Sequence, residues 1–127
     1  MTDTLEPLRD WFRAWEACVR ALDFAEARLL FEADVSGFGT FAPIVHGSDA
    51  LEREQWRNVW PKITDFRFEV ERLHGAVHGD TAWAAVPWTS TGFDADGRSF
   101  PRPGRATVIL RRMGAVSPPA DPASELK

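Results

Sequence analysis

Three polar residues have types and positions suited to chemistry on a small molecule. Asp34 follows an apolar helical segment, where a buried carboxyl could serve as a general base, or could instead bond the backbone amides at the segment's end. His46 precedes a glycine at the end of a short predicted hairpin and could act as an acid or base near pH 7, or be structural. Arg105 begins an apolar strand and could hold a carboxylate or enolate, or be solvated at a strand edge. We take these three as candidate catalytic residues.

Two further spacings resemble metal sites. His74 and His78 lie on a predicted strand, where a rise of ~3.3 Å per residue separates them by about 13 Å, too far to share one ion. The run Asp94-Ala95-Asp96-Gly97 resembles the start of a calcium loop, but the following residues supply no carboxylate, so we interpret it as a hairpin turn. We expect no metal and no cofactor.

The aromatic composition is unusual, with six Trp and nine Phe but no Tyr. Any mechanism that needs a phenol is therefore excluded. Large rings bury much area, so they could simply fill a core, or they could line a pocket for an apolar ligand. The candidate ligand-binding residues are Trp15, Phe31, Phe41, Trp56, Trp60 and Trp88.

Size and charge limit the protein class. The chain has 127 residues, 44% of them hydrophobic and 27% charged, which is ordinary for one globular domain. A net charge of −4 gives no basic field for nucleic acid or an anionic membrane. The single Cys18 cannot form an internal disulfide, and the first residues are too polar for a signal peptide. We expect a cytoplasmic protein whose partner is a small molecule, with no nucleic acid and no membrane.

Helices come first along the chain. Apolar residues recur at helical spacing in three segments, 5–23, 24–31 and 48–63. Pro61 should end or kink the third helix. The glycine-broken segment between the second and third helices predicts two short strands, at 35–41 and 44–46.

Strands follow from Asp65 onward. Apolar and charged residues alternate at 66–71, and the apolar parity then changes, which a bulge near Arg72 would explain. Further strands are expected at 81–93 and 105–113. Trp83 and Trp88 would face opposite sides of the sheet unless a bulge at Pro87 intervenes. Helices followed by antiparallel strands predict an α+β fold, with the helices packed on one face of a curved sheet.

The order of these elements, together with three local motifs, carries a family resemblance. The motifs are LLFEADVSG, where Phe31 precedes Asp34, then HGSDAL, then GFDADGRSFPRPGRATVILRR. From Thr4 to Met113 the chain resembles the SnoaL-like and ketosteroid-isomerase-like proteins of the nuclear-transport-factor-2-like superfamily. The resemblance implies an antiparallel sheet wrapped into a cone, with three N-terminal helices packed on its concave face around a small-molecule cavity.

The catalytic residues of ketosteroid isomerases do not carry over. That family uses a tyrosine on the first helix, an aspartate base on the early hairpin and a neutral aspartate on a later strand. The corresponding positions fall on Trp15, on Gly39 and in the stretch 98–119, which contains no acid. Two functions stay open. One is a SnoaL-like domain that binds a small, largely apolar molecule, with isomerase, cyclase or dehydratase chemistry. The other is a non-catalytic ligand-binding or dimerisation module.

The C-terminal segment departs from the family. The resemblance implies one more strand beside the one that ends at Met113, but the tail contains prolines 118, 119 and 122, which cannot sit in a paired strand. We expect a cone domain at 1–116 and a disordered tail at 117–127. Either the tail reflects an altered or truncated reading frame, or another chain supplies the neighbouring strand, which predicts a homodimer.

Overall fold

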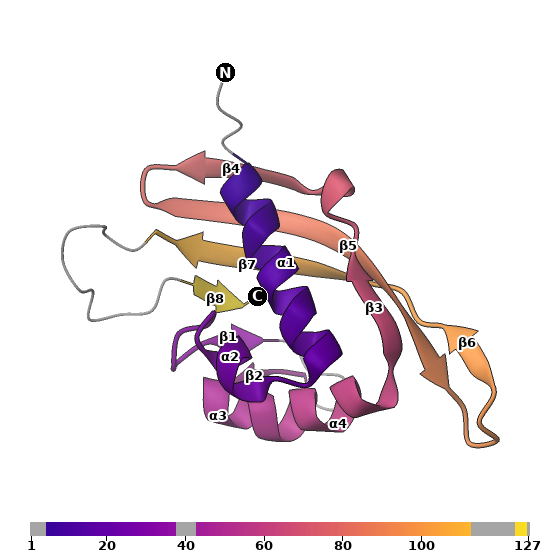
Figure 1. Ribbon diagram of the computed structural model, residues 1–127. Coiled ribbons are helices and arrows are strands. Elements are labelled where there is room, and N and C mark those ends of the chain that lie inside the picture. The colour runs from indigo at the N-terminus through magenta and orange to yellow at the C-terminus, as the bar shows by residue number, and fades with distance from the viewer. Residues whose placement is uncertain (1–4, 38–42, 113–123, 127) are drawn as a thin grey trace.

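The structure is a computed structural model, and it describes residues 5–37, 43–112 and 124–126 (Figure 1). Its helical part comprises α1 (Glu6–Ala21), α2 (Phe24–Arg28) and a continuous helical stretch over residues 48–62. That stretch consists of α3 (Ser48–Ala50), a π-helix (Leu51–Trp56), α4 (Arg57–Val59) and a 3-10 turn (Trp60–Lys62). Pro61 lies in this last turn, so the helix ends there as expected.

The boundary between α1 and α2 follows from local chemistry. Leu22 adopts a left-handed conformation (φ 55°) and its N–H bonds carbonyls of the last turn, which ends α1. The carboxylate of Asp23 then accepts the N–H of Glu26 at 3.1 Å and caps α2. The second helix is shorter than expected and stops at Arg28. The N–H of Phe31 bonds the carbonyl of Arg28, three residues back, so the chain tightens into turns.

The π-helix has a packing reason. Leu51 and Trp56 are both almost fully buried, although they are five residues apart. In an α-helix, at 3.6 residues per turn, such residues point about 140° apart. Bonds from i to i+5 widen the turn and bring both side chains toward the core.

The six-stranded sheet is organised around one long strand, β5 (Thr81–Phe93). On one edge, β4 (His74–His78) pairs with its first half and β3 (Thr64–Phe68) with its second half. On the other edge lie β7 (Gly104–Arg111) and β6 (Ser99–Pro101). A 3-10 turn (Val70–Arg72) separates β3 from β4, so the expected change of parity is present, but a turn produces it rather than a bulge.

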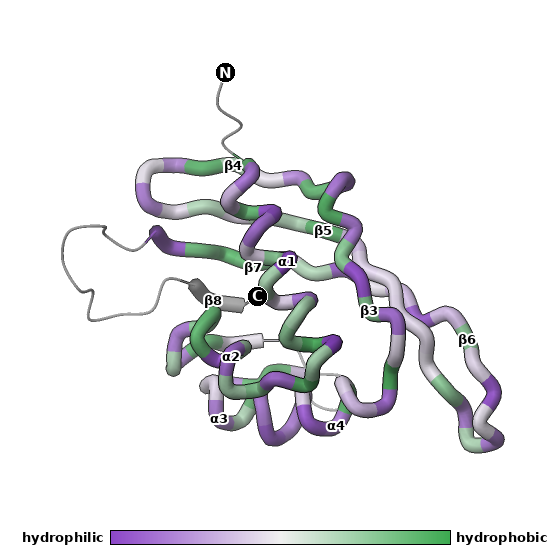
Figure 2. The backbone as a smooth tube through the Cα atoms, in the orientation of Figure 1, coloured by the Kyte–Doolittle hydropathy of each residue, from purple (hydrophilic) through white to green (hydrophobic). Residues whose placement is uncertain are grey.

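The helices cover the concave face of this curved sheet. Figure 1 shows α1 running across the face, with α2 and the α3–α4 stretch at one end of it. Figure 2 shows apolar segments of β5 and β7 beside α1. The even residues of β5 from Ala82 to Val86 are buried, whereas Trp83 is 42% exposed on the outer face and Trp88 packs on Phe66 inside. The α+β fold with helices on a curved antiparallel sheet is confirmed, and so is the opposite facing of the two tryptophans.

The strand that β7 lacked in the sequence comes from the C-terminus. Ser124–Leu126 form β8, which pairs antiparallel with β7 from Val108 to Leu110. A short two-stranded sheet of β1 (Ser36–Gly37) and β2 (Val45–His46) lies near β8. Within the segment 117–127, for which we expect a disordered tail, residues 124–126 form this strand, which begins beyond the last proline at residue 122. Residues 113–123, and with them the possible pairing of 115–117, lie outside the described residues.

Candidate functional site

The three candidate catalytic residues are all exposed. Asp34 lies in the turn before β1, and His46 lies on β2, where its Nδ1 is 2.7 Å from the hydroxyl of Ser36 on the paired strand. The carbonyl of Ala33 accepts the N–H of Ser48, so the segments that carry Asp34 and His46 are adjacent. Arg105 lies opposite Pro87 on the outer face of the sheet. The structure therefore brings Asp34 and His46 to one side of the molecule and leaves Arg105 elsewhere.

The candidate ligand-binding aromatics belong mostly to one buried cluster. Ring centroids lie 5.2 Å apart for Trp15 and Phe31, 5.5 Å for Phe31 and Trp56, and 4.9 Å for Trp56 and Trp60. Trp88 is half-buried and joins the cluster through Phe66, at 5.4 Å. Phe41 lies outside the described residues. These rings pack on one another, so most of this aromatic set forms the core of the described protein.

One buried polar atom in this cluster has no partner. The indole nitrogen of Trp15 has no hydrogen-bond acceptor among the described residues, although only 8% of the residue is exposed. Leaving such a donor unpaired costs about 1–3 kcal/mol. The Trp15 ring is surrounded by four other rings whose centroids lie within 6.1 Å of its own, those of Trp11, Phe12, Phe31 and Phe68. A buried N–H group of this kind can donate a hydrogen bond to an acceptor atom of a ligand.

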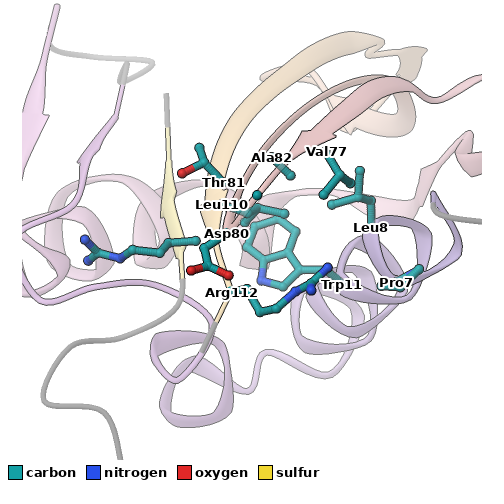
Figure 3. Close-up of a pocket in the computed structure, with 11 residues that line it drawn as sticks. Pro7, Leu8, Trp11, Val77, Asp80, Thr81, Ala82, Leu110 and Arg112 are labelled. Carbon is teal, nitrogen blue, oxygen red and sulfur yellow. The ribbon is translucent and has the colours of Figure 1, made fainter. Parts of the chain in front are cut away.

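A pocket of about 190 Å³ adjoins the cluster between the start of α1, the β4–β5 turn and the end of β7 (Figure 3). Trp11 forms its inner wall, and the Trp11 ring lies 5.4 Å from Trp15 and 5.3 Å from Phe31. The remaining apolar lining comes from Pro7, Leu8, Val77, Ala82 and Leu110. The cavity is therefore largely apolar, with one aromatic wall shared with the core.

Charged groups lie only at the rim of this pocket. Asp80 and Arg112 flank it on the β4–β5 turn and at the end of β7, and the N–H of Arg112 bonds the carbonyl of Asp80 at 2.6 Å. Arg111 also lines the pocket, but its guanidinium donates to the buried carboxylate of Glu32. The guanidinium of Arg112 has no ion pair with any described carboxylate, so it is available to a ligand.

Sequence reasoning missed Glu32 and this pocket. Glu32 is 6% exposed, whereas the neighbouring acid that the family motif indicated, Asp34, faces solvent. No periodicity singles out Glu32, because residues 31 and 35 share the buried side of that segment. The distant partner Arg111, 79 residues away, is visible only in the fold. Trp11 was discernible as an apolar helix position, but nothing marked it as a pocket wall.

The residues suspected of metal binding have ordinary structural positions. The carboxylate of Asp94 accepts the N–H groups of Asp96 and Arg98 at 2.9 Å, and Gly97 has a positive φ of 80° in a tight hairpin turn. His74 and His78 are the two ends of β4. The described part of the chain contains no group of three His, Cys, Asp or Glu side chains able to hold an ion. In the same part, no helix is long and apolar enough to cross a membrane.

A comparison of the sequence with models of protein families shows to which family the chain belongs. A model of the SnoaL-like domain matches residues 8–116, which is most of the chain. The chain belongs to the SnoaL-like family. No curated protein matches the sequence.

Solved structures share the fold of this SnoaL-like chain. A ketosteroid isomerase-like protein from Erwinia carotovora atroseptica has a TM-score of 0.75 and 16% identity, over 99% of this chain and 92% of that one. An NTF2-like superfamily protein from Salmonella enterica serovar Typhimurium gives 0.74 and 12%, over 95% and 84%. An NTF2-like protein from Streptomyces avermitilis, described provisionally as a dehydratase, gives 0.72 and 18%, over 96% and 90%. At these identities the likeness establishes the NTF2-like cone fold alone.

Proposed function

We propose that this SnoaL-like protein binds a small, largely apolar molecule in the pocket beside Trp11. The observation that carries the proposal is the cavity of about 190 Å³ whose inner wall is the edge of the aromatic cluster. An apolar engineered cavity of about 150 Å³ holds benzene. The ligand portion held here is therefore about one ring with a short substituent, rather than a fused polycycle.

Polar groups next to the pocket would orient the ligand. Specificity in such sites comes from a few polar groups around an apolar cavity. Arg112 can pair with an acceptor or an anion at the rim. The N–H of Trp15, one ring behind Trp11, can donate to a ligand carbonyl that reaches past the indole. We therefore favour a ligand that has at least one oxygen acceptor on an apolar ring.

Binding is better supported than acid–base catalysis. Isomerase or dehydratase activity is suggested by the descriptions of structural neighbours, whose identity to this chain is 18% or less in the examples above. Asp34 and His46 are solvent-exposed and neither lines the pocket. Trp15, at the position of the isomerase tyrosine, can donate a hydrogen bond but has no readily lost proton. If turnover is found, His46→Ala and Asp34→Ala should leave its rate unchanged.

Two measurements test the binding proposal. Native mass spectrometry of the purified chain should reveal a retained molecule or bind an added single-ring probe such as acetophenone. Val77→Phe fills the pocket from β4 and should weaken acetophenone binding at least tenfold. Thr89→Phe adds the same ring at an exposed position on β5 and should leave the affinity within twofold. Equal affinity in the two variants would refute this location of the site.

A dimerisation role has its own observation. Trp83 is 42% exposed on the outer face, where its cross-strand neighbours are Ala76 and Ile109. Trp83 and these partly exposed neighbours form one apolar area on this face, and contiguous exposed apolar areas mark protein contacts. We propose a homodimer of a cytoplasmic protein in addition to ligand binding. Light scattering should give twice the chain mass, and Trp83→Lys should restore the monomer.

A further inference from the structure

The outer face of the sheet contains a second hollow, separate from the apolar pocket. It has a volume of about 370 Å³ and lies over β4, β5 and β7. Its floor on the outer face is formed by Ala85 and Pro87, and Thr107 lies beside them. Residues 84 and 86 of β5 are buried toward the helices, so 85 and 87 face away from them. The hollow is thus on the opposite side of the sheet from Trp11.

Among the described residues, Arg72, His74 and Arg105 bring nitrogen-bearing side chains to this hollow, and no carboxylate lines it. Arg72 comes from the 3-10 turn before β4, His74 from the first position of β4, and Arg105 from β7. His74 pairs with Ala85, and Arg105 pairs with Pro87 two residues further along β5, so the two lie diagonally across one strand on one face. The sheet therefore brings donors from three elements to one place.

One of the two arginines at this hollow has no ion pair. The protein is acidic overall, with a net charge of −4. Most of the arginines form ion pairs with described carboxylates, namely Arg9, Arg13, Arg28, Arg53, Arg57, Arg67, Arg72 and Arg111. Arg72 forms an ion pair with Glu69 at 3.4 Å, whereas Arg105 pairs with no described carboxylate, as is also true of Arg20, Arg98, Arg102 and Arg112. An unpaired guanidinium in a hollow is a ready partner for an external anion.

We propose that this hollow binds a phosphoryl group of a small molecule. The lining residues Arg72, His74, Arg105 and Thr107 carry two guanidinium groups, an imidazole and a hydroxyl on three elements, and such a set of donors suits a tetrahedral oxyanion with several acceptor oxygens. A planar carboxylate needs only one arginine fork. Ala85 and Pro87 leave a shallow apolar floor for the atoms attached to the phosphoryl group. Arg105 thus binds an anion, but outside the pocket that faces the aromatic core.

The test uses inorganic pyrophosphate as probe and the whole chain, followed by 1H–15N NMR at constant ionic strength. We expect saturable shifts at residues 72–74, 85–87 and 105–107, while the pocket residues Leu8 and Trp11 stay unchanged. Arg105→Gln should raise the dissociation constant at least tenfold. Arg98→Gln removes the same charge from the exposed β5–β6 hairpin and should change it less than twofold. Dispersed spectra of both variants establish that they are folded.

Three outcomes would overturn the proposal. One is equal weakening by the two variants, or shifts spread over arginines of the whole surface. Another is the absence of saturable shifts at residues 72–74, 85–87 and 105–107, whether the chain is a monomer or a homodimer. The third is binding of malonate, a dianion without a tetrahedral oxyanion, as tightly as pyrophosphate, which would refute the phosphoryl assignment. Since the apolar pocket is monitored in the same spectra with acetophenone, each site can fail without the other.

Discussion

Gly104→Ala should destabilise the protein because of one close approach between neighbouring strands. A Cβ built on Gly104 would lie 2.1 Å from Cζ2 of Trp88 and 2.5 Å from its Cε2. The Trp88 ring cannot move freely, since it packs on Phe66 with centroids 5.4 Å apart and lies under the Arg102 guanidinium at 5.5 Å. The added methyl group must therefore displace either an anchored ring or the backbone of β7.

The expected magnitude follows from two opposing effects. Overpacking of an interior site costs about 1–3 kcal/mol. Replacing a strand glycine by alanine recovers about 0.5–1 kcal/mol of conformational entropy. The net loss is about 1–2 kcal/mol, which for a chain of this size lowers Tm by roughly 3–10 °C. Urea unfolding followed by far-UV circular dichroism measures it directly.

Gly92→Ala provides a matched control on β5. Its Cβ would also meet an aromatic ring, 2.7 Å from Cζ of Phe100, but Phe100 is 42% exposed and can swing aside. We expect a change of about 0.5 kcal/mol or less, as for ordinary surface substitutions. Trp88→Leu should remove most of the cost of Gly104→Ala in a double-mutant cycle. An equal cost for the two glycines, or an undiminished cost in the Trp88→Leu background, would refute this reasoning.

Other predictions concern ionisable groups. Arg111→Gln should lower the free energy of unfolding in urea by about 1–2 kcal/mol, because it leaves the buried Glu32 carboxylate without its cation. The loss is limited because solvent screens the half-exposed guanidinium. A loss no larger than that caused by Arg13→Gln, in an exposed pair, would contradict this. Burial raises the pKa of the Cys18 thiol, so iodoacetamide should label Cys18 far more slowly in the folded chain than in urea. The labelling rate of the folded chain should still rise above pH 9. Equal rates in the folded and unfolded chain, followed by mass spectrometry, would disprove the effect of burial. The Arg13 and Arg9 guanidiniums lower the pKa of Glu6, so Glu6→Gln should lower Tm at pH 7. The difference in Tm between the variant and the unchanged chain should disappear as acid protonates the Glu6 carboxyl. A pH-independent difference would show that the pairs do not matter.

The longest elements could be predicted from the sequence because their patterns are long. Helical spacing over the 16 residues of α1 identifies that helix, and Asp23 marks the start of α2 by its capping chemistry. Turn residues on both sides, at Gly79-Asp80 and at 94–97, delimit β5, and the odd spacing of Trp83 and Trp88 predicts that they face opposite sides of the sheet. In each case local physics and tertiary packing agree.

Other features depend on contacts between distant residues. Ser124–Leu126 has no strand signal of its own and pairs because the edge of β7 offers unpaired backbone groups. The π-helix exists so that Leu51 and Trp56 can both reach the core. The buried Glu32 carboxylate accepts a hydrogen bond from Arg111, which lies far away in the sequence, at the end of β7. The pocket forms where α1 crosses two strand ends, and no single segment reveals it.

The most direct test of ligand binding at the pocket reads the indole N–H signals of the tryptophans. Each gives its own 1H–15N resonance, assigned by single Trp→Phe substitutions, during titration with acetophenone. The account predicts saturable shifts at Trp11, which lines the pocket, then at Trp15 behind it, with Trp83 on the outer face unchanged. Unchanged Trp11 and Trp15 signals, or shifts confined to Trp83, would contradict it.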